Sequence, residues 1–204
     1  MAVQHNRMVF WDVDTQVDFM LPEGKLYVPG AERIIPNLER LTRWAAEHSI
    51  LVIADMDAHH EGDEEFREYP PHCLVGTPGQ RKVPETVLSR QYVIPDDAVE
   101  LPPDFSSYQQ VVIEKDHVDV FTNPNVERLL AKLGGETEIY LYGVVTEVCV
   151  RLAAEGLLER GYRLHLVQDA VQHWDPAKGS ETLRRVQEKG GRLTTTEQAL
   201  TSHA

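Results

Sequence analysis

The segment Ile139-Tyr-Leu-Tyr-Gly-Val-Val-Thr-Glu-Val-Cys149-Val decides the fold, because it joins an apolar strand to a helix within a few residues. The apolar run over 138–142 is typical of a buried strand. Thr146 is a suitable N-cap for a helix that continues to Arg160. The segment therefore predicts a strand–helix unit that places Cys149 on the first turn of the helix.

Similar apolar runs recur along the chain and alternate with amphipathic stretches. The predicted strands cover 8–13, 50–55, 110–114, 138–142, 163–169 and 192–195. The predicted helices cover 31–47, 125–133, 146–160 and 176–189. Repeated strand–helix units favour an α/β fold, namely a Rossmann-like three-layer sandwich with a mostly parallel sheet flanked by helices. The stretch 56–104 is rich in proline, glycine and charge, and we expect an irregular functional loop there.

The composition limits the classes of protein that this chain can belong to. Its 204 residues contain no linker or internal repeat, so we expect a single domain over 1–204. The formal net charge of −13 argues against nucleic acid and membrane as partners. The apolar runs are strand-sized and the first residues lack a signal-peptide pattern, so we expect a cytoplasmic protein. Cys73 and Cys149 have no disulfide-framework spacing, which favours free thiols.

Reactive side chains stand at the ends of four predicted strands: Asp14, Asp57, Lys115 and Cys149. The carboxyl ends of parallel strands share one edge of the sheet, where ligands bind in this class of fold. The dipole of a helix favours a thiolate on its first turn, which suits Cys149 as a nucleophile. Asp14 would then act as a general base, and Lys115 would lower the pKa of the thiol. The alternatives are a buried structural cysteine, a turn-forming aspartate and a surface lysine.

A second group of residues suits a metal ion. Asp57 and His59 lie two residues apart on an extended segment and so point the same way, and His72 can return to the same point. Oxygen and nitrogen ligands of this kind suit zinc, iron or manganese. A polar loop with incidental histidines is the alternative, and the acidic run 61–65 as a whole is more typical of a solvated loop.

Taken together, these residues resemble the isochorismatase-like superfamily of cysteine hydrolases, and within it the nicotinamidases (pyrazinamidases) most. Asp14-Thr-Gln16-Val-Asp18-Phe19 resembles the family's Asp-x-Gln-x-Asp-Phe. Lys115 with Phe121 resembles its Lys-x-x-x-Ser-Ala-Phe, and the segment 143–149 resembles its Gly-Val-Ala-Thr-Asp-x-Cys. The resemblance extends over about 8–193 and strengthens the α/β prediction.

The resemblance implies a role for each matching residue. The implied catalytic triad is Asp14, Lys115 and Cys149. A cis peptide bond between Val144 and Val145 is also implied, with the backbone N–H groups of Val145 and Cys149 forming an oxyanion hole. The implied metal ligands are Asp57, His59 and His72, and the implied substrate contacts are Phe19, Tyr69, Val144 and Val145.

The chain departs from the family pattern at several positions. Asp119-Val120 replaces Ser-Ala, and Ala58 replaces a common tryptophan between the metal-site residues. Glu65 stands where a fourth metal-site histidine is frequent, which makes it a candidate extra ligand. Glu64, His60 or water are the alternatives at that position. Tyr69 stands where tryptophan is common.

The implied function is hydrolysis of a carbon–nitrogen amide bond, from nicotinamide to nicotinate and ammonia, through a thioester on Cys149. The implied cofactor is a divalent metal ion, zinc before iron or manganese, which orients the ring of the small-molecule amide. The alternatives are a metal-independent carbamoyl- or ureido-amide hydrolase, an isochorismatase proper, a non-catalytic small-molecule-binding homologue, and a redox pair of Cys149 with Cys73. Family analogy implies a homo-oligomer. The roles of His117 and Trp174 stay open.

Overall fold

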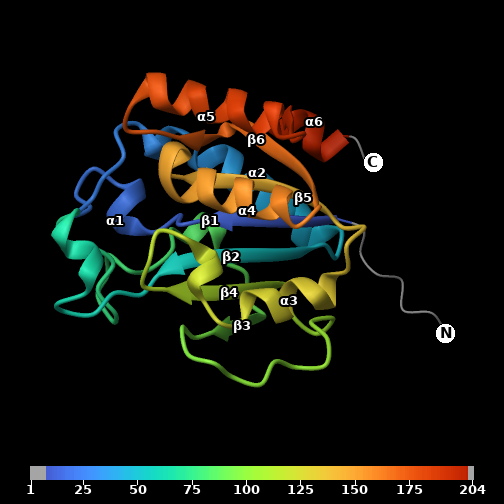
Figure 1. Cartoon of the computed structure of the whole chain (residues 1–204), viewed down its shortest axis with the longest axis horizontal. Helices are drawn as coiled ribbons and strands as arrows, with labels where there is room; N and C mark the ends of the chain where they lie inside the picture. The colour runs from blue at the N-terminus through green and yellow to red at the C-terminus, as the bar shows by residue number, and fades with distance from the viewer. Residues whose placement is uncertain (1–7, 202–204) are drawn as a thin grey trace.

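A seven-stranded sheet lies at the centre of the molecule, and the computed structural model describes residues 8–201. The strands are β1 (Met8–Val13), β2 (Leu51–Asp57), β3 (Gln91–Ile94), β4 (Gln110–Lys115), β5 (Glu138–Val144), β6 (Arg163–Gln172) and β7 (Arg192–Thr194). Their order is β3-β4-β2-β1-β5-β6-β7, and all neighbouring strands run parallel (Figure 1). The prediction of a parallel α/β sheet is confirmed. That the whole chain, 1–204, forms one domain stays a prediction.

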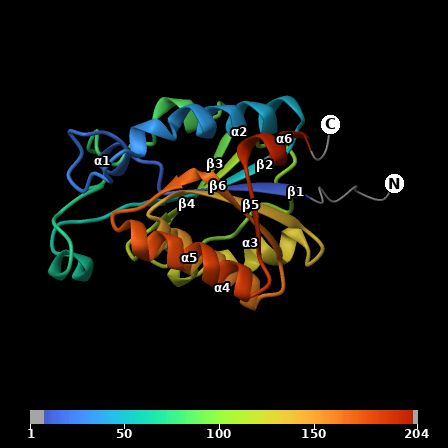
Figure 2. The ribbon, with the colours of Figure 1, turned by 90° about the horizontal axis from the view of Figure 1, so that it is seen from above.

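Helices cover both faces of the sheet and complete three layers (Figure 2). They are α1 (Val17–Met20), α2 (Ile35–Glu47), α3 (Val126–Leu133), α4 (Arg151–Glu159), α5 (Pro176–Glu188) and α6 (Thr196–Thr201). Figure 2 shows α2 and α6 on one face and α3, α4 and α5 on the other. No helix between residues 8 and 201 is both long and apolar enough to cross a membrane.

The side chains of β1 alternate between two hydrophobic cores, one on each face of the sheet. Val9, Trp11 and Val13 pack in the core beneath α3, α4 and α5, whereas Met8 and Phe10 pack in the core beneath α2 and α6. Successive side chains of a strand point to opposite faces, so a strand that is buried on both faces is mostly apolar. This explains why β1 matches its predicted bounds of 8–13. The exception in β1 is Asp12, which is buried and accepts from Lys82 Nζ at 2.8 Å.

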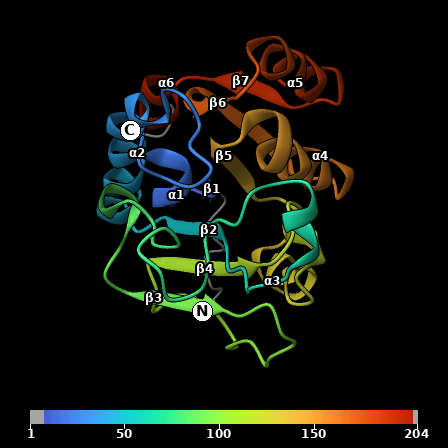
Figure 3. The same cartoon turned by 90° about the vertical axis from the view of Figure 1, so that its left-hand side faces the viewer.

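The strand order places a crevice beside the carboxyl end of β1. The chain leaves β1 for β2 on one side of it and later enters β5 on its other side. Ligands bind at such a reversal of strand order, outside the carboxyl ends of the strands. Figure 3 faces this edge of the sheet, where α1 and the long segment after β2 lie together.

Several elements differ from the sequence prediction. The stretch 56–104 is not irregular throughout, because it contains the edge strand β3, whose residues are mostly half-buried or exposed and so show no clear apolar run. Helix α6 was not predicted. Thr146 is not a helix N-cap: its hydroxyl donates to the carbonyl oxygen of Gln172 at 2.8 Å, and the helix begins with a π-helical turn over Thr146–Val150.

The end of β5 depends on one glycine. Gly143 has φ of +119° and is paired with Val13 of β1, whose carbonyl oxygen would lie 2.1 Å from an added Cβ atom. Only glycine meets both demands, the positive φ and the close backbone approach. Directly after it, the peptide bond between Val144 and Val145 is cis, as the family resemblance implied.

We predict that Gly143→Ala lowers the free energy of unfolding by about 3 kcal/mol or more, because backbone strain adds to a clash with β1. Gly135→Ala is the matched control, since nothing lies within 4 Å of its added Cβ atom. We expect the control to change stability by less than about 0.5 kcal/mol. Urea unfolding of both variants checks the prediction, and equal stabilities would contradict it.

Candidate active site and metal centre

Three strand ends bring the predicted catalytic side chains together. Asp14 follows β1, Lys115 is the last residue of β4, and Cys149 lies on the π-helical turn after β5. The Lys115 Nζ atom donates to Asp14 Oδ2 at 3.0 Å, and the Cys149 thiol interacts with the same carboxyl group. All three residues are buried, and Lys115 has no exposed surface. The surface-lysine alternative is therefore wrong, and the three groups form one contact network.

The backbone at Asp14 is held in an unusual conformation. Its φ of 48° lies in the left-handed region, which non-glycine residues rarely adopt. Its N–H donates to the carbonyl oxygen of Asp55 at 3.1 Å, and its own carbonyl accepts from the N–H of Gln16 at 2.8 Å. Strain of this kind costs about 1–3 kcal/mol and clusters at functional sites. Here the conformation places a carboxylate in the crevice between β1 and β5.

The charges of the network depend on burial and on each other. Burial, together with repulsion from Asp57, raises the pKa of Asp14 to about 6, although Lys115 and the thiol oppose the shift. Burial alone would lower the pKa of Lys115, but attraction to Asp14 and Asp57 outweighs it and holds that pKa well above its usual value. At neutral pH the network therefore contains an ionised Asp14 and a protonated Lys115.

The expected thiolate at Cys149 is not supported in the resting site. Burial raises the pKa of Cys149 well above its usual value, and the opposing charge of Lys115 does not offset the loss of solvent. A helix terminus that is closed off from water does not by itself ionise a thiol. The nucleophile would therefore need Asp14 to remove its proton during the reaction.

The turn that carries Cys149 is tied in place by its own backbone. The N–H of Val150 donates to the carbonyl oxygen of Val145 at 3.1 Å, and that of Val148 donates to the same oxygen at 3.0 Å. The side chains of Val145 and Cys149 line the same pocket. The oxyanion hole formed by their N–H groups stays a prediction.

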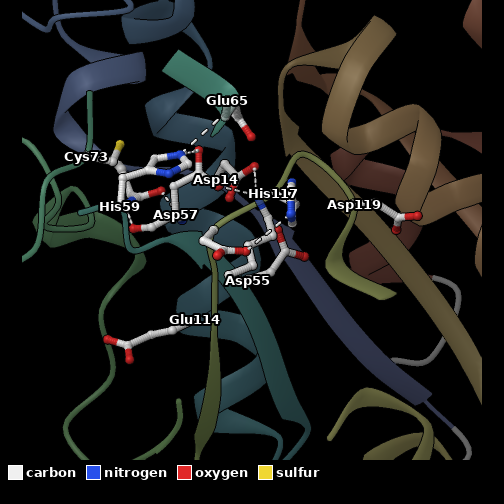
Figure 4. A network of polar contacts seen from close by, with 12 residues as sticks. Asp14, Asp55, Asp57, His59, Glu65, Cys73, Glu114, His117 and Asp119 are labelled. Carbon is white, nitrogen blue, oxygen red and sulfur yellow. Dashed lines mark hydrogen bonds and ion pairs between the residues drawn. The ribbon is translucent and has the colours of Figure 1, made fainter. Parts of the chain in front are cut away.

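A metal-ligand cluster lies beside this network. One ligand atom from each of four residues lies within 4.8 Å of the others: Asp57, His59, Glu65 and His72. The Nε2 atom of His72 is 3.3 Å from Asp57 Oδ2, and both imidazole Nε2 atoms are 3.6 Å from Glu65 Oε1. Figure 4 shows Asp57, His59 and Glu65 pointing toward one another beside Asp14.

Outer partners orient both histidines. His59 Nδ1 lies 3.1 Å from Asp63 Oδ2, and His72 Nδ1 lies 2.8 Å from the carbonyl oxygen of Pro70. An outer partner on one imidazole nitrogen is the usual arrangement for a histidine whose other nitrogen binds a metal. Both Nε2 atoms therefore face the centre of the cluster.

The cluster fits a divalent metal ion. His59 Nε2 and Glu65 Oε2 are buried without a hydrogen-bond partner among the described residues. Burial lowers the pKa of His59, but attraction to the nearby carboxylates of Asp57, Glu65 and Asp63 outweighs it and raises this pKa to about 10. A metal ion would replace that proton. His60 and Glu64 are exposed, so Glu65 is the acidic-run residue that joins the ligand set.

Two residues of the first motif support the site in ways that the sequence analysis did not assign. The side-chain amide of Gln16 donates to the carbonyl oxygen of Asp57 and accepts from its N–H, both at 2.8 Å. The carboxylate of Asp18 accepts from the N–H of Cys73 at 2.7 Å, next to His72. The two-residue spacing of these polar side chains in a buried segment was the available signal.

A small pocket joins the two clusters. It is lined by Phe19, Leu26, Asp57, Glu65, Tyr69, His72, Val118, Val145, Val148, Cys149 and Trp174. The predicted substrate contacts Phe19, Tyr69 and Val145 are among them. Val144 is fully buried and does not line this pocket, and its predicted contact with substrate stays a prediction.

Of the residues without an assigned role, Trp174 lies at the pocket and the others lie outside it. Trp174 belongs to the pocket wall. His117 is half exposed and its nearest acidic partner is Asp116, at 3.8 Å. Asp119 points away from the clusters in Figure 4 and instead accepts from the N–H of Phe121 at 3.0 Å. Cys73 is buried and packs in the core, which agrees with a structural thiol.

Comparisons with known proteins identify the family and the fold of this chain. The family model for the isochorismatase domain matches residues 91–198. A protein of Bacillus subtilis, described as uncharacterized isochorismatase family protein PncA, is 27% identical over 169 residues, which are 78% of this chain and 82% of that protein. The solved pyrazinamidase of Pyrococcus horikoshii in complex with zinc is 28% identical with a TM-score of 0.74, and the match covers 93% of this chain and 99% of that one.

A second solved structure shares the fold alone. The N-carbamoylsarcosine amidase of Thermoplasma acidophilum has a TM-score of 0.74 at 23% identity, over 93% of this chain and 96% of that one. Proteins with this fold act on different amides, so the fold alone does not determine the substrate of this chain.

We predict that Glu65→Ala weakens zinc binding by about 10- to 100-fold, because a buried ligand is lost while Asp57 and both histidines stay. Glu64→Ala is the matched control, since the neighbouring carboxylate is exposed and lies outside the cluster. Competition with a chromogenic chelator, together with elemental analysis, measures both affinities. Equal affinities in the two variants would remove Glu65 from the ligand set.

Proposed function

The chain belongs to the isochorismatase family, whose model matches more than half of it, and from this premise we propose a cysteine amidohydrolase that converts nicotinamide to nicotinate and ammonia. One observation carries the proposal. Lys115 contacts both Asp14 and Asp57, so the nucleophile's base and a metal ligand share one buried cation. Cys149 and three residues of the metal cluster, Asp57, Glu65 and His72, also line the same pocket.

In the proposed mechanism the Cys149 sulfur attacks the amide carbonyl while Asp14 takes the thiol proton. The N–H groups of Val145 and Cys149 would hold the oxyanion. Asp14 then passes its proton to the leaving ammonia, and a thioester forms on Cys149. Water that gives its proton to Asp14 hydrolyses the thioester, and Asp14 returns that proton to the leaving Cys149 sulfur as the acid is released. Lys115 stays protonated and holds the Asp14 carboxylate in place.

The metal ligands in this proposal are Asp57, His59, Glu65 and His72. A bound divalent ion, zinc first and then iron or manganese, would supply a Lewis-acid position for the ring nitrogen of the substrate. The zinc complex of the Pyrococcus pyrazinamidase supports this choice. Glu65 adds a second carboxylate, so two acids and two neutral histidines would balance the charge of the ion.

The pocket favours an uncharged, planar substrate. Its wall is mostly apolar or aromatic, and the acidic residues in it belong to the metal cluster. Among the described residues, no lysine or arginine lines it. Lys115 is occupied by two carboxylates. A carbamoyl amino acid would bring a carboxylate without a cationic partner, so the carbamoyl-amide hydrolase is the less favoured candidate. Its support is the shared fold of the Thermoplasma amidase.

We propose no macromolecular partner, and the substrate is a small amide. A homo-oligomeric state, implied by family analogy, and a cytoplasmic location, expected from the sequence, both stay predictions. The high net negative charge continues to argue against nucleic acid as a partner.

We predict that Cys149→Ala lowers the rate of ammonia release from nicotinamide by about 10³-fold or more, because the covalent step is lost. Cys73→Ala is the control thiol variant, and we expect it to keep turnover within about tenfold, because its side chain lies in the core outside the pocket. Zinc content should be unchanged in both variants. Full turnover in Cys149→Ala would exclude the nucleophile.

The wild-type protein itself separates the two candidate activities. Stoichiometric metal with rapid ammonia release supports the nicotinamidase. Bound metal without ammonia release from nicotinamide would indicate that the substrate is another ring amide. A metal-free protein that releases no ammonia from nicotinamide but hydrolyses carbamoyl amino acids would support the carbamoyl-amide hydrolase instead.

We predict an acid limb in the pH profile of kcat/KM for nicotinamide. Asp14 has to be ionised to accept the thiol proton, and its pKa is about 6, so activity should be present above this pH and fall below it. The measurement runs from about pH 4.5 to 8, and melting temperatures are followed in parallel to exclude unfolding. A profile that stays flat through pH 5 would mean that Asp14 is not the base.

A further inference from the structure

The space beside Cys149 is small. Its volume is about 10 Å³, close to the smallest space that holds one water molecule. Two aromatic rings from different parts of the chain form one side of it: Tyr69 comes from the long segment after β2, and Trp174 follows β6. Their ring centroids are 5.9 Å apart and their planes differ by 30°. A substrate ring therefore has to displace part of this wall.

Trp174 is the fixed member of the wall. Its backbone N–H donates to Glu147 Oε1 at 3.0 Å, and its indole N–H donates to the carbonyl oxygen of Tyr27 at 3.3 Å. The next residue, Asp175, also donates its N–H to Glu147 Oε1, at 2.8 Å, and caps α5 with its own side chain. Backbone and ring are thus both anchored, which limits how far the indole can move.

Glu147 connects this wall to the nucleophile. It lies on the same π-helical turn as Cys149, two residues before it, and its side chain is half-buried. One carboxylate oxygen accepts the two N–H groups of the Trp174 loop. The position of the indole is therefore set relative to the turn that carries the thiol.

We propose that Trp174 is a specificity-determining residue that limits the size of the ring that reaches Cys149, and that Glu147 is its positioning residue. For the choice among amides, this inference rests on the proposed amidohydrolase function. The control of access applies to any electrophile that reaches the thiol, so it can be tested separately from turnover.

The first test measures access without turnover. Cys149 is alkylated with iodoacetamide and with its larger N-naphthyl derivative, and mass spectrometry of the Cys149 peptide gives both rates. In Trp174→Ala we expect the ratio of the large-reagent rate to the small-reagent rate to rise at least about tenfold, because the indole no longer closes the wall. Trp44→Ala is the matched control, since that indole stacks on Phe10 and His48 along α2.

The positioning role of Glu147 has its own test. Glu147→Ala removes the acceptor of both loop N–H groups, and we expect it to raise the same ratio about threefold or more. Glu147→Gln keeps an acceptor oxygen at the same place and should return the ratio to the wild-type value. A role in general stability alone would change the melting temperature without this pattern of loss and rescue.

The second test uses substrates. Quinoline-3-carboxamide is nicotinamide with a fused benzene ring, and we expect Trp174→Ala to raise its kcat/KM relative to that of nicotinamide about tenfold. If the wild-type protein releases no ammonia from nicotinamide, the proposed function fails and the alkylation ratio alone decides the inference. An unchanged alkylation ratio in Trp174→Ala, or no reaction with the large reagent, overturns it. Trp174→Leu serves if the alanine variant does not fold.

Discussion

The buried ammonium group of Lys115 is the interaction on which the rest of the site depends. It is fully buried and ion-paired with both Asp14 and Asp57, so a single cation links two carboxylates away from water. Removing one member of a buried ion network leaves an uncompensated charge, which costs several kcal/mol. The three residues come from the ends of β1, β2 and β4, so this one requirement fixes the relative position of three strand ends.

The geometry of the sheet supplies the partners of that cation. Asp57 and Lys115 are neighbours in the register of β2 with β4, and Asp14 follows β1 on the other side of β2. The reversal of strand order at β1 then leaves room for the turn after β5, which carries Cys149. Asp14, with its left-handed backbone, and Gly143, with its positive φ, both lie at this point. The backbone strain of Asp14 is therefore located where the reactive groups meet.

Burial raises the pKa of both the acid and the thiol of the proposed reaction, but it leaves them with different charges at neutral pH. It raises the pKa of Asp14 only to about 6, which leaves the carboxylate ionised at neutral pH, whereas it keeps the Cys149 thiol protonated. A base beside a neutral thiol is a resting state from which one proton transfer produces the nucleophile. The same exclusion of water comes from the aromatic wall of Tyr69 and Trp174, so access and reactivity have a common cause.

The sequence by itself determined the parallel α/β fold, because strands that are buried on both faces are mostly apolar, as in 8–13, where Asp12 is the exception. It also placed Asp14, Asp57, Lys115 and Cys149 at strand ends, where parallel strands share an edge. Only the tertiary structure decided that Glu65, and not Glu64 or His60, lies in the candidate metal cluster, since this depends on how a loop folds back. The protonated state of Cys149 and the place of Trp174 in the wall were likewise decided by burial and by contacts between segments far apart in the chain, which no local pattern encodes.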